Sequence, residues 1–115
     1  MKDVVSMELR EIIEKFKTLG AYEERSFADN YCEVVFYTKD NDRWIKLFTE
    51  ILGPAIKPAG IAPSEEDAEL TKEYGGIRAN QTLFKGIMGN TVVAVMFWPW
   101  QDEVRITLKI AFIAM

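Results

Sequence analysis

The last third of the chain is a succession of short strand-like segments joined by very short turns. Segments 81–88, 91–98 and 103–112 are rich in β-branched and aromatic residues, the usual composition of strands. None approaches the length of about 20 apolar residues that a membrane-spanning helix needs. The Gly-Asn pair at 89–90 favours a two-residue hairpin turn, and residues 99–102 supply a second turn. Strands joined this closely pair as antiparallel neighbours, so the sequence predicts a three-stranded meander.

Three other segments have the periodicity or the end signals of helices. Residues 6–19 and 41–52 each place apolar side chains along one helical face. A third, acidic helix opens at Ser64, because Asp67 follows at the spacing of a capping box. Residues 54–63, which precede this helix, contain three prolines and one glycine. That composition predicts an extended connector between the second and third helices.

One further strand precedes the second helix. Residues 31–38 have the composition of a strand, and residues 21–27 are placed to pair with them across a turn at 29–30. The order of the main elements is then α-β-α-α-β-β-β. We therefore predict a single α+β domain over residues 1–115, with a largely antiparallel sheet, a C-terminal three-strand meander, and helices packed on one face.

Pairing across the turns assigns the side chains of the meander to two faces, because directly opposed residues share a face. The first turn sets Phe84 opposite Val95, and the second sets Val95 opposite Ile106. It also sets Phe97 opposite Val104. This apolar face is the predicted core. The other face is apolar along the middle strand and bordered by cations, whereas the open face of a two-layer domain should alternate to polar.

Three alternatives explain the apolar strip on this second face. A helix or the connector covers it, two copies of the chain stack through it, or it forms the wall of a ligand-binding cleft. The residues expected in a homodimer interface are Leu83, Ile87, Val92, Met96 and Trp98. In a cleft, the bordering cations would anchor a carboxylate or phosphate. The residues expected to hold such a ligand are Arg105, Lys85, Lys109, Trp98, Trp100 and Arg78.

The segment Trp98-Pro99-Trp100 places two indoles at the end of a predicted strand. Proline has no backbone N–H, so Pro99 is expected to end the strand ladder. An exposed Trp100 would provide a stacking platform for a ligand or a partner. The alternative, which we favour, is that its ring folds back over the end of the core.

The residue inventory removes several classes of chemistry. The chain has no histidine, which excludes histidine general bases and the Ser-His and Cys-His nucleophilic pairs. Its one cysteine excludes an internal disulfide and a cysteine-cluster metal site. The acidic neighbour Glu33 opposes thiolate formation, so we interpret Cys32 as a buried apolar residue. We predict no metal and no cofactor.

The overall charge narrows the range of partners and locations. Fourteen Lys+Arg against 18 Asp+Glu give a formal net charge of −4, which disfavours nucleic acid and anionic membranes. The N-terminus has no apolar run of signal-peptide length, and a lone cysteine is typical of a reducing compartment. We therefore expect a cytoplasmic protein that does not enter the membrane.

These observations favour binding or assembly over catalysis. The leading hypothesis is a small soluble domain that forms a homodimer through the second sheet face and holds a small anionic or amphipathic ligand beside Arg105 and the two tryptophans. A histidine-independent, metal-free enzyme that uses Glu33, Tyr37 and Arg78 is the alternative. A third hypothesis is a subunit whose sheet face docks to another protein.

Overall fold

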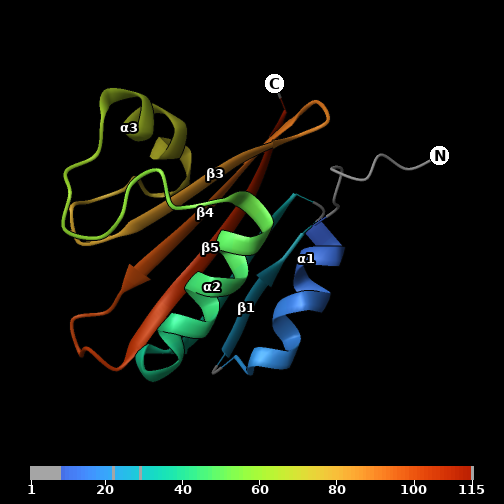
Figure 1. Ribbon diagram of the computed structural model, residues 1–115, viewed down its shortest axis with the longest axis vertical. Coiled ribbons are helices and arrows are strands. Elements are labelled where there is room, and N and C mark those ends of the chain that lie inside the picture. Colours follow the sequence, from blue (N-terminus) through green and yellow to red (C-terminus); the bar gives the residue numbers. More distant parts are fainter. Residues whose placement is uncertain (1–8, 22, 29, 115) are drawn as a thin grey trace.

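The chain folds as an α+β domain, which confirms the predicted class. The computed structural model describes residues 9–21, 23–28 and 30–114. Over these residues the chain forms a five-stranded antiparallel sheet in the order β1-β2-β5-β4-β3 (Figure 1). In chain order the elements are α1 (Leu9–Phe16), η1 (Lys17–Leu19), β1 (Glu23–Phe27), β2 (Tyr31–Tyr37), η2 (Thr38–Asp40), α2 (Asn41–Leu52), α3 (Glu65–Thr71), η3 (Lys72–Tyr74), β3 (Thr82–Met88), β4 (Thr91–Pro99) and β5 (Arg105–Ala114).

The N-terminal half contains one strand more than the predicted order. β1 pairs with β2, as the pattern of residues 21–27 allowed, with an irregularity between Glu24 and Ser26. The predicted capping box of the third helix is present, because the side chains of Ser64 and Asp67 each accept a hydrogen bond from the other's backbone N–H. Residues 6–8 of the first predicted helix and Asp29 of the predicted turn lie outside the described residues.

The first hairpin of the meander has the predicted register, and the second does not. β3 and β4 pair across residues 89–90 with Phe84 opposite Val95. In the second hairpin, Val95 lies opposite Ile110 rather than Ile106. The shift is even, so every strand side chain stays on its predicted face.

The register shift follows from where the second turn lies. β4 ends at Pro99, as expected, but Pro99 is itself paired and lies opposite Ile106, so the strand is one residue longer than predicted. The N–H of Trp100 donates to the carbonyl oxygen of Arg105 at 2.9 Å, so by strand alternation the nitrogen of Pro99 points toward β3 instead. β3 begins only at Thr82, so no residue of β3 lies opposite Pro99. The missing N–H of the proline therefore costs no hydrogen bond of the sheet. The turn therefore lies further along the chain, and Val104, predicted on the core face, is an exposed turn residue.

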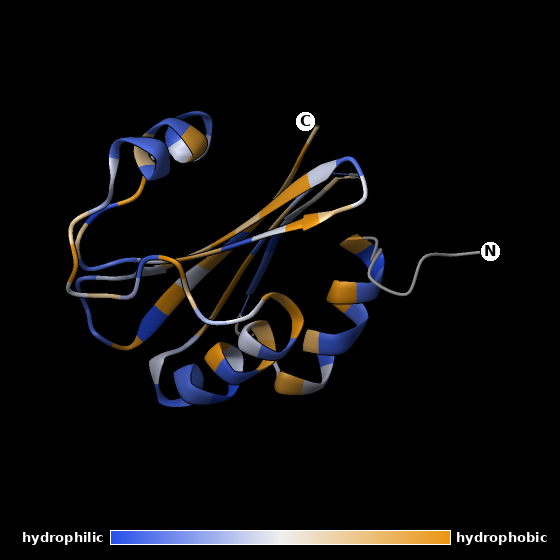
Figure 2. Cartoon of the chain, turned by 45° about the horizontal axis from the view of Figure 1, so that its top comes forward, coloured by the Kyte–Doolittle hydropathy of each residue, from blue (hydrophilic) through white to orange (hydrophobic). Residues whose placement is uncertain are grey.

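Helices α1 and α2 pack on one face of the sheet and enclose the main core (Figure 2). The aromatic rings of this core meet at Phe97. Its ring centroid lies between 5.5 and 5.8 Å from those of Phe36, Phe48 and Phe84. Trp44 of α2 stacks on Phe36 with centroids 4.4 Å apart. Aromatic packing between β2, α2, β3 and β4 therefore holds the first layer of helices on the sheet.

The segment α3–η3 lies on the opposite face of the sheet (Figure 2). The prediction of helices on one face therefore holds for α1 and α2, and α3–η3 adds a third layer. Leu70 of α3 and Tyr74 of η3 pack against a second cluster of buried residues. Its buried members are Ile77, Leu83, Ala94 and Met96. This packing covers the apolar strip over β3 and β4, as in the first of the three alternatives.

Cys32 lies fully buried on the core face of β2, which confirms its interpretation as an apolar residue. Burial, reinforced by the carboxylates of Glu24 and Glu33, raises the pKa of its thiol from 9.0 to about 12. The thiolate, which is the reactive form, is therefore much scarcer in the folded protein than in the unfolded chain at neutral pH.

We therefore expect iodoacetamide to alkylate the native protein much more slowly than the urea-unfolded protein, because the thiol is both buried and protonated. Mass spectrometry measures both rates without ambiguity, because Cys32 is the one cysteine of the chain. Similar rates in the native and unfolded protein would contradict the buried, protonated thiol.

Candidate functional site

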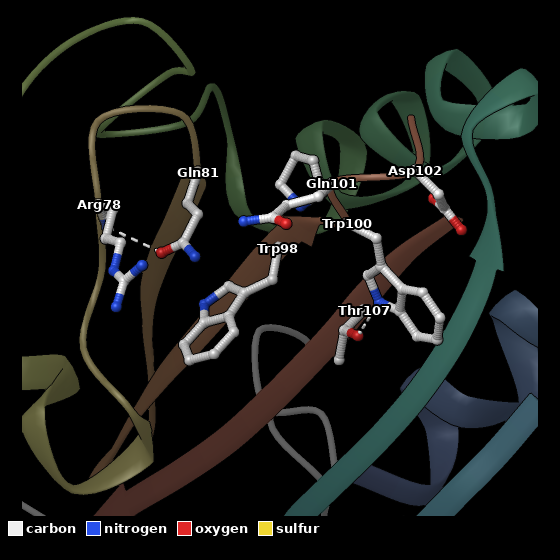
Figure 3. Close-up of a pocket in the computed structure, with 8 residues that line it drawn as sticks. Arg78, Gln81, Trp98, Trp100, Gln101, Asp102 and Thr107 are labelled. Carbon is white, nitrogen blue, oxygen red and sulfur yellow. Dashed lines mark hydrogen bonds between the residues drawn. The ribbon is translucent and has the colours of Figure 1, made fainter. Parts of the chain in front are cut away.

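An open cavity of about 530 Å³ lies on the second face, where β4 runs into the following turn (Figure 3). We call it the tryptophan pocket. Its lining residues are Arg78, Gln81, Trp98, Pro99, Trp100, Gln101, Asp102 and Thr107. Figure 3 shows the indoles of Trp98 and Trp100 on either side of the cavity. The fold thus brings together three of the six residues that the sequence suggested for a ligand, namely Arg78, Trp98 and Trp100.

Strand alternation places Trp98 on the second face, and the backbone of η3 approaches it closely. A Cβ at position 75 would lie 2.4 Å from Cη2 of Trp98, so this contact requires the glycine that is present. Gly75 also has a φ of +99°, which favours glycine. The ammonium of Lys109 lies 3.4 Å from the centroid of the Trp98 ring. The indole is therefore fixed on the side away from the pocket by Gly75 and Lys109.

Trp100 folds over the second face, so the prediction that it closes the end of the core is wrong. Because pairing continues through Pro99, strand alternation gives Trp100 the same face as Trp98. Its indole N–H donates to the hydroxyl of Thr107 at 2.7 Å. The guanidinium carbons of Arg105 and Arg25 lie 4.5 and 5.2 Å from the ring centroid. Two cations and one hydrogen bond thus hold this half-buried ring.

Arg105, the expected principal anchor for an anion, is engaged by Asp102 and does not line the pocket. Its Nε and Nη2 donate to Oδ2 of Asp102 at 2.9 and 2.7 Å. Oδ1 accepts the backbone N–H groups of Val104 and Arg105 at 2.9 and 3.2 Å. These bonds, that from Val104 first, lower the pKa of Asp102. The carboxylate therefore stays charged, and both of its oxygens are occupied by the turn.

Arg78 is the available cation of the pocket. Its side chain is exposed, and its guanidinium has no ion-pair partner among the described residues. The loop that carries it is closed by two hydrogen bonds to Gln81. The N–H of Arg78 donates to Oε1 of Gln81 at 2.8 Å, and the N–H of Gln81 donates to the carbonyl oxygen of Arg78 at 3.0 Å. The loop is therefore an ordered wall of the pocket.

Lys57, in the connector at residues 54–63, is hydrogen-bonded to this loop, although no prediction from the sequence singled it out. The residue is 1% exposed. Its ammonium donates to the main-chain carbonyl oxygens of Pro58 at 3.0 Å, Ala79 at 3.1 Å and Gln81. Burial lowers the pKa of Lys57, and the carboxylate of Asp67 opposes that shift. The signal that would have found it is its position as the single charged residue of the segment 54–63.

Lys109 and Lys85 lie in other depressions of the surface. Lys109 donates to the carbonyl oxygen of Tyr74 at 2.8 Å and lies opposite Glu33 in the sheet. Desolvation lowers the pKa of Lys109, while Glu33 opposes the shift. It lines a separate depression of about 370 Å³. Lys85 lines another, of about 570 Å³, with acidic residues of α3. Neither lysine lines the tryptophan pocket.

The surface expected for a homodimer is interrupted. Leu83 and Met96 are fully buried under the chain's own α3–η3 segment and have no surface to offer a second copy. Ile87 remains 60% exposed, with Val92 half-buried opposite it. The continuous apolar strip of the sequence analysis is therefore not present on the surface.

The tryptophan pocket does not gather the three residues of the alternative enzyme hypothesis. Arg78 lines the tryptophan pocket, whereas Glu33 and Tyr37 do not. Glu33 accepts a hydrogen bond from the hydroxyl of Tyr31 at 2.8 Å and lies 3.7 Å from a guanidinium nitrogen of Arg25. Its carboxylate is thus engaged on β2 by structural partners.

Within the described residues, no group of three or more Asp, Glu, Cys or His side chains is placed to hold a metal ion. No helix in that part of the chain is long and apolar enough to cross a membrane. No family model, curated protein or solved structure matches this chain. Its function is therefore argued from the geometry of the pocket.

Proposed function

We propose that this domain binds a small amphipathic molecule in the tryptophan pocket. The apolar part of the ligand would lie against Trp98 and Trp100, and its anionic part would face Arg78. The observation that carries the proposal is the arrangement of two half-buried indoles around a cavity of about 530 Å³, together with a cation that has no ion-pair partner among the described residues. Cavities of this size with apolar walls and a few directed polar groups are typical of small-molecule sites.

Binding has more support than catalysis or self-association. The one carboxylate among the lining residues, Asp102, is fully hydrogen-bonded within the turn, which leaves no general base there. Self-association through the second face has less support because α3–η3 buries Leu83 and Met96. Rigid indole rings supply large contact areas at low entropic cost, which suits a ligand-binding wall.

Anilinonaphthalene sulfonate, an aromatic anion that fluoresces in apolar surroundings, tests the proposal. We expect it to bind at a single saturable site and to quench tryptophan emission. Trp100→Ala removes one wall and should weaken binding about 10-fold or more, whereas Trp100→Phe should retain most of it. Arg78→Met should weaken binding about 10-fold because the anion loses its cation.

Two control variants locate the probe. Lys85→Met removes a cation of the same face in a different depression, and Ile87→Ala removes an exposed apolar residue outside the pocket. Both should bind the probe like the wild type, and thermal melts should show every variant folded. Binding that survives Trp100→Ala but is lost in Ile87→Ala would place the probe elsewhere and overturn the proposal.

A further inference from the structure

The polar side of the tryptophan pocket is built from hydrogen-bond donors. Gln81 is only 7% exposed, and its position is set by three bonds. Its Oε1 accepts from the N–H of Arg78, its N–H donates to Arg78, and its carbonyl oxygen accepts from Lys57. The first bond occupies the oxygen end of the amide and leaves the Nε2 end unpartnered among the described residues. Gln81 therefore presents a fixed donor to the cavity beside the guanidinium of Arg78.

The neighbouring polar groups add donors. The hydroxyl oxygen of Thr107 accepts from Trp100, so its O–H is left to donate. The indole N–H of Trp98 has no acceptor among the described residues, but the atom is buried and does not itself face the open cavity. Figure 3 shows the nitrogen edge of this ring turned toward Arg78 and Gln81. The acceptor oxygens of Asp102 are already filled.

A donor-rich site favours a ligand group that only accepts hydrogen bonds. A carboxylate has two oxygens and no donor, and its planar shape matches the two-pronged donor geometry of a guanidinium. A neutral amide or an ammonium ion would bring N–H donors, for which Asp102 has no free oxygen and the exposed amide of Gln101 is the remaining side-chain acceptor of the lining. The two indoles meanwhile offer contact to a flat apolar ring.

From this arrangement we infer that the pocket selects aromatic carboxylates, with Arg78 and Gln81 binding the carboxylate and the two tryptophans contacting the ring. The inference rests on the proposed binding function and adds the chemical class of the ligand. It also gives Gln81 a role in specificity, since its amide offers a donor where an acidic residue would repel the ligand.

Naphthoate and naphthamide form the test pair because they share the same aromatic ring. Naphthoate carries a carboxylate, which only accepts hydrogen bonds, whereas naphthamide carries a neutral amide, which also donates them. Isothermal titration should show about 10-fold or more tighter binding of naphthoate. Gln81→Glu keeps an oxygen for the N–H of Arg78 but replaces the free donor with negative charge. It should weaken naphthoate binding about 10- to 100-fold and leave naphthamide binding nearly unchanged.

Arg78→Met provides a second variant at an exposed position, and we expect it to fold because the loop bonds to Gln81 use the backbone of residue 78. It should lower the preference for naphthoate to near unity, while the control Lys85→Met keeps it. Equal affinity for the two compounds, or an unchanged preference in Gln81→Glu, would overturn the inference. The proposed function would survive that result if anilinonaphthalene sulfonate still required Trp100. Loss of the requirement for Trp100 would remove the proposed function and the inference together.

Discussion

Replacing Lys57 by methionine should lower the free energy of unfolding by about 2–4 kcal/mol. The methionine side chain has a similar length but no hydrogen-bond donor, so the carbonyl oxygens of Pro58, Ala79 and Gln81 lose their common donor. A hydrogen bond to a charged group contributes about 1.5–3 kcal/mol, and the relief of the buried ammonium's desolvation offsets part of the loss. Urea unfolding followed by tryptophan fluorescence measures the difference.

Lys46→Met is the matched control, because Lys46 is exposed on α2. It should change the free energy of unfolding by less than about 0.5 kcal/mol. The ammonium of Lys57 also holds Gln81 in the pocket wall, so Lys57→Met should weaken the binding of anilinonaphthalene sulfonate, and Lys46→Met should not. A Lys57→Met variant as stable as the wild type would contradict the assigned role.

Phe97→Ala should destabilise the domain by about 3–5 kcal/mol. The Phe97 ring is 2% exposed and contacts the rings of Phe36, Phe48 and Phe84. Truncation leaves a cavity where β2, α2, β3 and β4 meet, and the backbone of a central strand cannot collapse to fill it. Phe97→Leu keeps most of the volume and should cost about 1.5 kcal/mol or less. Urea unfolding measures both variants.

Val104→Ala is the control that separates the two possible registers of the second hairpin. In the register expected from sequence, Val104 lies opposite Phe97 in the core, and its truncation would cost stability. In the structure Val104 is 52% exposed in a turn, so Val104→Ala should change the free energy of unfolding by less than about 0.5 kcal/mol. A loss as large as that of a core residue would contradict the observed register.

The faces of the sheet were predictable although one register was not. A strand's side chains alternate with a period of two, so an even error in the turn leaves every face unchanged. The error came from the turn, which was expected at residues 99–102 although Pro99 is still paired as the last residue of β4. A proline can lie within β4 at this position because the neighbouring strand β3 begins only at Thr82. The side of Pro99 that faces β3 therefore has no strand partner. This information is not local to the turn.

The candidate site was predictable in part. Trp98, Trp100 and Arg78 were suspected from residue type and position, and the fold gathers them around one cavity. Arg105 was ranked first among the cations, but a carboxylate three residues away, on Asp102, engages it. Pairing of that kind depends on the turn conformation, and the predicted turn was displaced.

The helices, the meander, the core face of the sheet and the absence of histidine chemistry could all be predicted from the amino-acid sequence. Those features follow from composition, periodicity and turn residues within short stretches. Contacts between distant segments settle what covers the second face, which pocket cation has no ion-pair partner among the described residues, and what Lys57 does. Lys57 meets the carbonyl oxygens of residues 22 and 24 positions away. Such contacts arise when packed layers exclude water and buried polar groups must find partners within the chain, and no local pattern specifies those partners.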